Sequence, residues 1–340
     1  MNRFRSVLAT TAAGVVALAL AGCASAAPET ADESAGAASG AFPLTIESAL
    51  GDAVIETEPT RVATWGWGAT DAVLALGIVP VAIPSDDYSG GDDRISPWIA
   101  DALDELGGEA PTILDNSTFE LKVEELLATD PDVLIAPYSG LTQEEFDEVT
   151  GAGIPVVAYP EGAWVTPWRD VVTITGEALG MDAEAEAILA ELDATVADAA
   201  AEHPEFAGTT ISTPVDSAGV WYLYLPADPR VEILEDLGFV SPPSVTELDT
   251  GESTFYTTVS PENLDKIDSD VVLTFVDEGA LETFTSSTTA QLIPAVQKGA
   301  VASLINGEQV SALTPTPLTL PWILPTLLEE LAAATAIAQG

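Results

Sequence analysis

Cysteine, histidine and basic residues are scarce in this 340-residue sequence, which has one cysteine, one histidine and nine lysines and arginines against 55 acidic residues. A single thiol, Cys23, cannot form a disulfide within the chain. Without clusters of histidine or cysteine there is no ligand set for zinc or another soft metal. The lone His203 also gives no basis for histidine-based acid–base catalysis.

The net charge of −46 argues against a nucleic-acid partner, because such a surface repels phosphate backbones. It argues equally against docking on anionic lipid by charge. The acidity fits a soluble surface, and the sequence leaves open whether it reflects a saline habitat. No GxxxxGK[ST] motif is present, and Gly66-Trp-Gly68 lacks the third glycine of a dinucleotide fingerprint. We expect a protein that is not an enzyme.

The first 22 residues have the pattern of a secretory signal peptide, with a basic start followed by a run of small apolar residues. They end in Leu-Ala-Gly-Cys, which resembles the lipobox of bacterial lipoproteins and predicts lipidation of Cys23. Residues 23–42 are small and polar and indicate a disordered tether. We therefore expect an extracytoplasmic body that a lipid anchor holds at the cell membrane.

The rest of the chain alternates strand-like and helix-like segments, which predicts an α/β fold with largely parallel sheets. An alanine-rich helix is expected from Asp182 to about His203, with a length of about 30 Å. For the helix before it, we expect Thr166 as the N-cap and Pro167 as the first helical residue.

Two pairs of segments repeat in the same order along the chain. Residues 124–140 resemble residues 262–279, each with an Asp-Val pair before an apolar strand, and residues 71–80 resemble residues 231–242. The repeat predicts two homologous Rossmann-like lobes joined by a single long, rigid α-helix. The expected boundaries are 43–180 for the N-terminal lobe, 181–204 for the linking helix and 205–338 for the C-terminal lobe.

Aromatic residues follow nearly every predicted strand, where ligands of α/β sheets bind. Three of the four arginines beyond the signal peptide lie among them, and one of these three is Arg169. A cleft with aromatic walls and a few convergent donors is typical of a small-molecule site. The candidate ligand-binding residues are Trp65, Trp67, Arg94, Tyr138, Trp164, Tyr222, Arg230 and Tyr256.

Residue alternation distinguishes the two tryptophans of the first loop. Neighbouring side chains of an extended segment point in opposite directions, so we place Trp67 toward the ligand and Trp65 inside the lobe. The glycines beside them are expected to let the backbone approach the ligand.

Four stretches, residues 61–83, 130–149, 157–170 and 255–273, resemble in order and spacing the substrate-binding lipoproteins of ABC importers for ferric siderophores. The resemblance implies that Arg94 and Tyr138 contact the iron-coordinating oxygens of a hydroxamate, and that Tyr256 packs on the siderophore from the second lobe. It also implies that Glu144 and Glu262 meet arginines of the permease dimer, with Glu145 as a near substitute. The protein would act as a monomer without a cofactor, since the siderophore itself holds the iron.

Charge narrows the ligand, because so acidic a body suits a neutral or cationic tris-hydroxamate complex better than an anionic tris-catecholate. Cobalamin stays open, whereas haem would need a tyrosine or Met181 as its axial ligand. A tethered carboxylate hydrolase or an adhesin is the alternative from another class. The sequence names neither the siderophore nor the permease, and it does not say which cleft aromatics touch the ligand.

Overall fold

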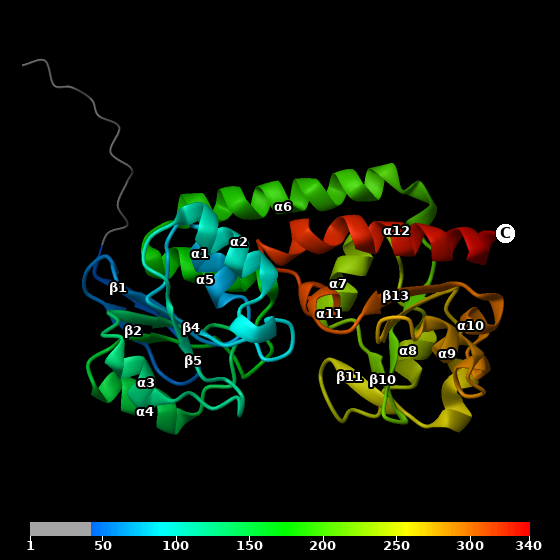
Figure 1. The fold of residues 1–340 in the computed structure, drawn as a ribbon, viewed down its shortest axis with the longest axis horizontal. Coiled ribbons are helices and arrows are strands. Elements are labelled where there is room, and N and C mark those ends of the chain that lie inside the picture. The colour runs from blue at the N-terminus through cyan, green and yellow to red at the C-terminus, as the bar shows by residue number, and fades with distance from the viewer. Residues whose placement is uncertain (1–41) are drawn as a thin grey trace, which may run out of the picture. The chain divides into compact units, whose positions relative to one another are not determined.

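The structure is a computed structural model that describes residues 42–340, which form two α/β lobes joined by one long helix (Figure 1). The predicted fold class is confirmed. The signal peptide, Cys23 and all but the last residue of the expected tether lie outside the described residues and stay predictions.

The first lobe is built on a five-stranded parallel sheet with the strand order β5-β4-β3-β6-β7. A two-stranded antiparallel sheet, β1-β2, precedes it. The strands are β1 (Leu44–Ile46), β2 (Ala53–Ile55), β3 (Val62–Thr64), β4 (Ala82–Pro84), β5 (Thr112–Leu114), β6 (Val133–Ile135) and β7 (Val156–Val157). The helices are α1 (Ala69–Ala75), η1 (Gly91–Asp93), α2 (Pro97–Leu106), α3 (Val123–Ala128), α4 (Gln143–Gly151) and α5 (Trp168–Leu179).

Both faces of this sheet are covered, so its central strands β3 and β6 are buried at every residue. Successive side chains of a strand point to opposite faces of the sheet. Val62 and Val133 pack with residues of α1 and α5, whereas Ala63 and Leu134 pack with residues of α3 and α4.

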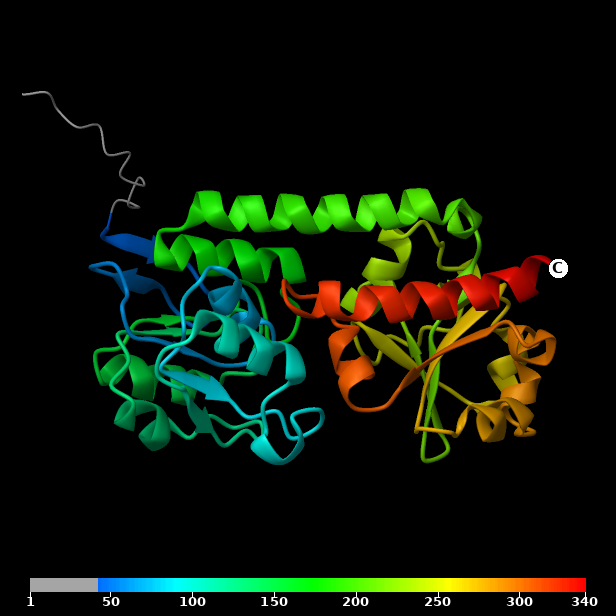
Figure 2. The ribbon, with the colours of Figure 1, turned by 45° about the horizontal axis from the view of Figure 1, so that its top comes forward.

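The linking helix α6 (Asp182–Glu202) matches the predicted span and runs along both lobes (Figure 2). Its buried residues are Ala185, Leu192, Val196 and Ala199, which lie on one helical face. The expected start of α5 is wrong, because the helix begins at Trp168 and Pro167 occupies the N-cap position. The Thr166 hydroxyl does not cap it and instead donates to the Pro137 carbonyl at 2.6 Å.

The second lobe has a three-stranded parallel sheet, β13-β12-β8, and a three-stranded antiparallel sheet, β11-β10-β9. The strands are β8 (Ile211–Ser212), β9 (Pro214–Ser217), β10 (Val220–Tyr224), β11 (Tyr256–Val259), β12 (Val271–Val276) and β13 (Val301–Ile305). The helices are η2 (Pro204–Phe206), α7 (Pro229–Asp236), α8 (Pro243–Glu247), η3 (Pro261–Lys266), α9 (Leu281–Ser286), η4 (Ala290–Leu292), α10 (Pro294–Lys298), α11 (Glu308–Ala312) and α12 (Thr319–Gln339).

The antiparallel sheet corrects the expectation that Tyr222 and Tyr256 lie in loops after strands, because Tyr222 belongs to β10 and Tyr256 to β11. Tyr224 is the last residue of β10. The hairpin between β9 and β10 turns at Ala218-Gly219, where φ is positive at both residues (51° and 87°), as a type I′ turn requires.

The two lobes share a hydrogen-bonding device that supports the predicted repeat. Before β6, Asp132 accepts from the backbone N–H of Thr60 at 2.8 Å and from its hydroxyl at 3.0 Å. Before β12, Asp270 accepts from the same two groups of Thr210 at 3.1 and 2.7 Å. The carboxylate thus fastens the start of a neighbouring strand in both lobes. The boundaries between the lobes stay predictions.

The C-terminal helix α12 is long and apolar enough to cross a membrane, but Leu327 and Leu331 are fully buried in the second lobe. Near its start, Trp322 packs against Trp98 of α2, with ring centroids 5.6 Å apart. Trp98 and Trp168 belong to the same hydrophobic cluster as residues of α6 and α12. The hydrophobic core is therefore continuous between the lobes.

Candidate functional site

Two adjacent cavities lie between the lobes at the carboxyl ends of the first-lobe strands, and together we call them the interlobe cleft. The large cavity has a volume of about 320 Å³, and the small cavity has about 10 Å³. They share Tyr138, Thr166 and Pro229. The large cavity is also lined by Glu161, Trp164, Val165, Pro167, Ala227, Glu232, Thr254 and Phe255. The small cavity is also lined by Trp67, Gly68, Trp168, Val171, Val172, Thr314, Pro315, Thr316 and Pro317.

The two tryptophans of the first loop point in opposite directions, as the alternation predicts. Trp65 is 3% exposed and packs in the first-lobe core. Trp67 lines the small cavity, and its buried indole N–H has no hydrogen-bond partner among residues 42–340. A buried unpaired donor costs about 1–3 kcal/mol, so an acceptor that entered here would be favoured.

Gly66 brings two loops of the first lobe together, and the expected approach of the backbone to a ligand stays a prediction. The backbone N–H of Trp67 donates to the Tyr138 carbonyl at 2.9 Å. A Cβ on Gly66 would lie 2.3 Å from that same oxygen. Gly66 therefore allows the loops after β3 and β6 to approach each other. Its φ of 85° also favours glycine.

Tyr138 and Trp164 form an aromatic wall of the large cavity, with ring centroids 5.6 Å apart and planes at 88°. Gly140 makes room for the indole, since a Cβ there would lie 2.7 Å from the Trp164 Nε1. Trp164 has a φ of 61° and is 37% exposed, so a large aromatic is held partly in solvent by a backbone conformation that is unusual for it. Burial raises the pKa of Tyr138, and nearby Asp228 acts in the same direction.

Arg230 of the second lobe lies close enough to this wall for its charge to lower the pKa of Tyr138, against the effect of burial. Its guanidinium binds both oxygens of the buried Asp228, at 2.8 and 2.6 Å, and donates to the Tyr224 hydroxyl at 3.1 Å. It also lies over the Tyr224 ring, 3.9 Å from the centroid. Burial alone would lower the pKa of Arg230, but the bidentate contact with Asp228 outweighs it and holds that pKa above its usual value.

Tyr222 and Tyr256 are brought together by the antiparallel sheet, with ring centroids 5.5 Å apart. Neither lines the two cavities of the cleft. Phe255, which packs edge-on against Tyr256 at 5.0 Å, does line the large cavity.

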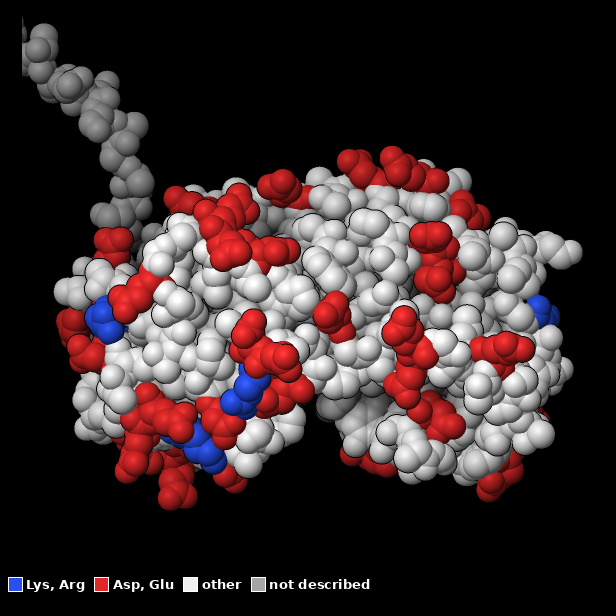
Figure 3. Space-filling model, in the orientation of Figure 1, with Lys and Arg blue, Asp and Glu red and all other residues white. Residues whose placement is uncertain are grey.

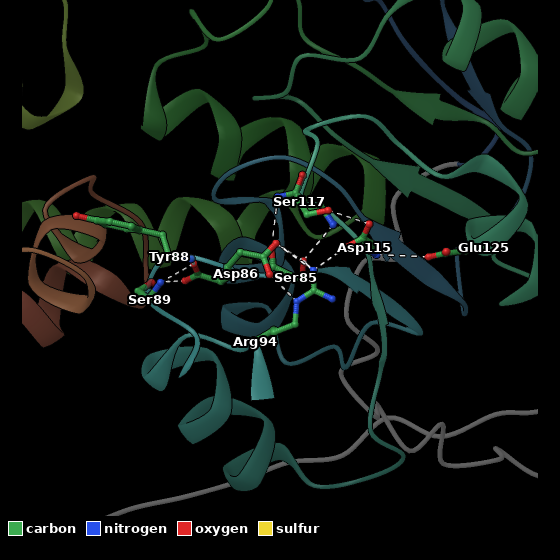
Figure 4. Close-up of polar contacts among 10 residues, drawn as sticks. Ser85, Asp86, Tyr88, Ser89, Arg94, Asp115, Ser117 and Glu125 are labelled. Carbon is green, nitrogen blue, oxygen red and sulfur yellow. Dashed lines mark hydrogen bonds and ion pairs between the residues drawn. The ribbon is translucent and has the colours of Figure 1, made fainter. Parts of the chain in front are cut away.

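Arg94 lies in a polar cluster of the first lobe (Figure 4). Its guanidinium contacts Asp87 at 2.5 Å, Asp115 at 2.7 Å and the Ser85 hydroxyl at 2.8 Å. These hydrogen bonds hold the pKa of Asp87 and of Asp115 below the usual range. The structure does not bring Arg94 to either cavity of the cleft, and two carboxylates already balance its charge.

Arg169, the third arginine expected near the ligand, joins three helices instead. It contacts Asp193 of α6 at 2.9 Å, and Glu232 and Asp236 of α7 at 2.8 and 2.9 Å. Arg169 belongs to α5 of the first lobe, so these contacts tie the first lobe, the linking helix and the second lobe together. Only Arg230 of the three arginines lies beside the aromatic wall.

The fold agrees with the comparisons to known proteins. The sequence profile of the family described as periplasmic binding protein matches residues 62–306. The chain belongs to the periplasmic binding protein family.

PiaA of Streptococcus pneumoniae, solved in complex with ferrichrome, is 33% identical to this chain. The match covers 86% of this chain and 99% of PiaA, with a TM-score of 0.79. A second PiaA structure, of an iron uptake ABC transporter substrate-binding protein, is 32% identical over 86% of this chain and 100% of PiaA, with a TM-score of 0.75. SirA of Staphylococcus aureus, solved with staphyloferrin B, shares the fold at 22% identity over 85% of this chain and 98% of SirA, with a TM-score of 0.66. No curated protein sequence matches this chain.

These relatives are substrate-binding proteins rather than enzymes, and the family as a whole implies an extracytoplasmic location. The described residues of this family member contain no group of three or more histidine, cysteine or acidic side chains that could hold a metal ion. His203 stacks on Phe206 at 4.7 Å and contacts Glu205 at 2.9 Å.

The glutamates expected at the permease interface are both exposed, Glu144 on α4 and Glu262 on η3. Glu144 lines an open acidic groove of about 590 Å³ between α3 and α4, on a molecule whose charged side chains on the visible face are mostly acidic (Figure 3). The Glu145 carboxylate is already hydrogen-bonded within the protein, because it completes the capping box of α4 with Thr142 and accepts from the backbone N–H of Leu121 at 2.7 Å. Glu145 is therefore a poorer substitute for Glu144 than the sequence suggests.

Several residues of the cleft were not predicted as site residues. Asp228 orients Arg230 and also caps α7, a role that its position before Pro229 signals. Thr316 and its neighbours reach the small cavity from the segment before α12. Nothing local in the sequence signals that approach, because it depends on how the lobes pack.

Proposed function

We propose that this protein captures a ferric siderophore in the interlobe cleft and delivers it to an ABC importer. The observation that carries the proposal is the cleft itself: about 320 Å³ of space walled by Tyr138, Trp164 and Phe255, with Arg230 close behind. That volume is within the range of small-molecule sites. The 33% identity to a protein solved with ferrichrome supports the same ligand class.

A ferric hydroxamate complex fits the charges that line the large cavity better than a ferric catecholate does. The large cavity is lined by Glu161 and Glu232 and by no lysine or arginine, and Arg94 is already paired with two carboxylates. A triply anionic catecholate complex would meet unfavourable potential here, whereas a neutral or cationic complex would not. The aromatic faces would pack on the ligand, and Trp67, Trp164, Tyr138 and Arg230 are the residues that we assign to it first.

Trp65, Arg94, Tyr222 and Tyr256 are weaker assignments on present geometry. Trp65 would act through the loop that carries Trp67. The other three would need a ligand that extends beyond the two cavities. The iron would be held by the siderophore alone, and the protein would need no cofactor.

Delivery would use a lipid anchor at Cys23 and one exposed glutamate on each lobe, Glu144 and Glu262. These would pair with arginines of the permease dimer, while the solute-binding protein itself stays a monomer. Since the hydrophobic core is continuous between the lobes, we expect small lobe movements on loading rather than wide closure.

A thermal-shift panel tests the ligand class. A ligand at 100 times its Kd stabilises the folded state by about 2.7 kcal/mol, which raises the Tm by about 5 °C for a protein of this size. Ferrichrome and ferrioxamine B should give such shifts and a ferric tris-catecholate should not. A shift with haem or cobalamin alone would transfer the proposal to that ligand.

A further inference from the structure

A buried hydrogen bond joins the two lobes behind the cleft wall. The Thr316 hydroxyl, in the segment before α12, donates to the Asp71 carboxylate of α1 at 2.6 Å, across 245 positions of sequence. Asp71 is 5% exposed and Thr316 is 3% exposed. No lysine or arginine of the described residues pairs with Asp71, and the charged group that bears on it is the like-charged Asp86.

The direction of this bond is fixed by the protons available. The Thr316 oxygen accepts from the backbone N–H of Thr319 at 3.0 Å and from that of Leu318 at 3.3 Å. The Thr319 hydroxyl uses its own proton on the Thr314 carbonyl at 2.8 Å. The single proton of Thr316 therefore has two acceptors within reach, the Asp71 carboxylate at 2.6 Å and the Thr319 hydroxyl oxygen at 3.0 Å. The shorter, charge-assisted bond to Asp71 is the stronger of the two. The segment that begins α12 is folded around this one hydroxyl.

Asp71 and Thr316 lie next to Trp67, the tryptophan that lines the small cavity. Thr316 lines the small cavity together with Trp67, and Asp71 lines a neighbouring pocket of about 60 Å³ that also includes Trp67. Gly68 lies between Trp67 and Asp71 in the chain, and a Cβ on Gly68 would lie 3.5 Å from the Thr316 methyl group. Movement of Thr316 away from Asp71 would change the wall on which Trp67 sits.

Burying a carboxylate without a cationic partner costs folding free energy. Burial raises the pKa of Asp71 to about 6, and the hydrogen bond from Thr316 acts in the opposite direction. A well-packed apolar pair would join the lobes at lower cost but without directionality. A directed, charge-assisted bond is suited to fixing one arrangement of the two lobes.

We propose that Asp71 and Thr316 are positioning residues that hold the two walls of the cleft at the separation required for ligand binding. The proposal rests on the proposed function for its ligand. The interlobe distance gives it a second readout that does not depend on any ligand.

The test compares three variants of the full chain. Thr316→Val keeps the shape and removes the hydroxyl, and Thr316→Ser restores the hydroxyl. Thr335→Val is the matched control, because Thr335 is a fully buried threonine of α12, the helix that follows Thr316, and its hydroxyl has no partner among the described residues. Ferrichrome affinity is measured by tryptophan fluorescence.

Thr316→Val should weaken ferrichrome binding about tenfold, the scale of a lost hydrogen bond to a charged group. Thr316→Ser and Thr335→Val should remain within about twofold of the parent protein. The proposal is overturned if Thr316→Val binds like the parent protein, or if Thr335→Val is equally weakened.

Distances between spin labels are measured on the same proteins without ligand. Labels at Glu148→Cys on α4 and Glu282→Cys on α9, in a Cys23→Ser background, report the separation of the lobes. Thr316→Val should broaden or shift the distribution, and an unchanged distribution would overturn the proposal. If the parent protein binds no ferric siderophore, the proposed function fails, and the distance measurement still decides the positioning role.

Discussion

Replacement of Asp71 by asparagine should stabilise the protein by an amount that depends on pH. The pKa of this carboxyl is raised from 3.8 to about 6 by burial in the folded chain. The folded state therefore binds the proton more tightly than the unfolded state. The resulting stability is complete below pH 3.8 and is lost as the pH rises through 6.

The magnitude follows from the shift in pKa. A difference of about 2 units, at about 1.4 kcal/mol per unit, means that ionised Asp71 costs about 3 kcal/mol at neutral pH relative to its protonated form. Asparagine has nearly the same shape, can still accept from Thr316 and carries no charge. The unfolded carboxyl is already partly ionised at pH 4, so the stability difference between Asp71→Asn and the parent protein should grow by about 2.5 kcal/mol between pH 4 and pH 7.5.

Urea unfolding followed by tryptophan fluorescence at several pH values measures this difference. Other titrating groups are shared by both proteins, so their contributions cancel. Asp101→Asn, at an exposed position of α2, controls for the loss of one surface carboxylate. A difference that stays flat within about 0.5 kcal/mol from pH 4 to pH 7.5 would refute the reasoning, because it would mean that the buried carboxyl does not titrate in this range.

Three further predictions concern Arg169, the two exposed glutamates and Cys23. Arg169→Met should lower the unfolding free energy by about 1–2 kcal/mol, since it leaves three partly exposed carboxylates facing one another; calorimetry in low and high salt measures this, and a loss without salt dependence would contradict it. Glu144→Gln combined with Glu262→Gln should reduce siderophore uptake by cells without changing ligand affinity, whereas Glu148→Gln on the same helix should leave uptake intact; a loss of affinity in the double variant would show that the glutamates are not docking residues. Cys23→Ser should release the protein from the membrane fraction into the soluble fraction, as cell fractionation with immunodetection can establish, and retention at the membrane would argue against a lipid anchor.

Much of the fold could be predicted because its signals are local. The apolar runs of β3 and β6, the long alanine-rich α6 and the repeated Asp-Val pairs each depend on short stretches of sequence. The antiparallel hairpin was missed because its signal is a single Ala-Gly pair, which is easily overlooked beside longer apolar runs. Tyr222 and Tyr256 were consequently expected in loops.

The candidate site was less predictable, because charge pairing depends on residues that are distant in sequence. Arg94 and Arg169 look alike in the sequence, yet each is paired with carboxylates from other elements, at Asp115 for the first and at Glu232 for the second. Trp67 was easier to place, since strand alternation alone separates it from Trp65. The direction of a side chain can thus be predicted from local sequence. Whether an arginine is already paired with carboxylates cannot, because its partners come from distant parts of the chain.

Titration of the purified protein with ferrichrome, followed by quenching of tryptophan fluorescence, tests the central claim most directly. The account predicts saturable quenching with one ligand per chain, and it predicts that Trp67→Phe reduces the amplitude much more than Trp65→Phe. No saturable quenching by ferrichrome or ferrioxamine B, with the protein shown to be folded, would contradict the claim that the interlobe cleft binds a ferric hydroxamate.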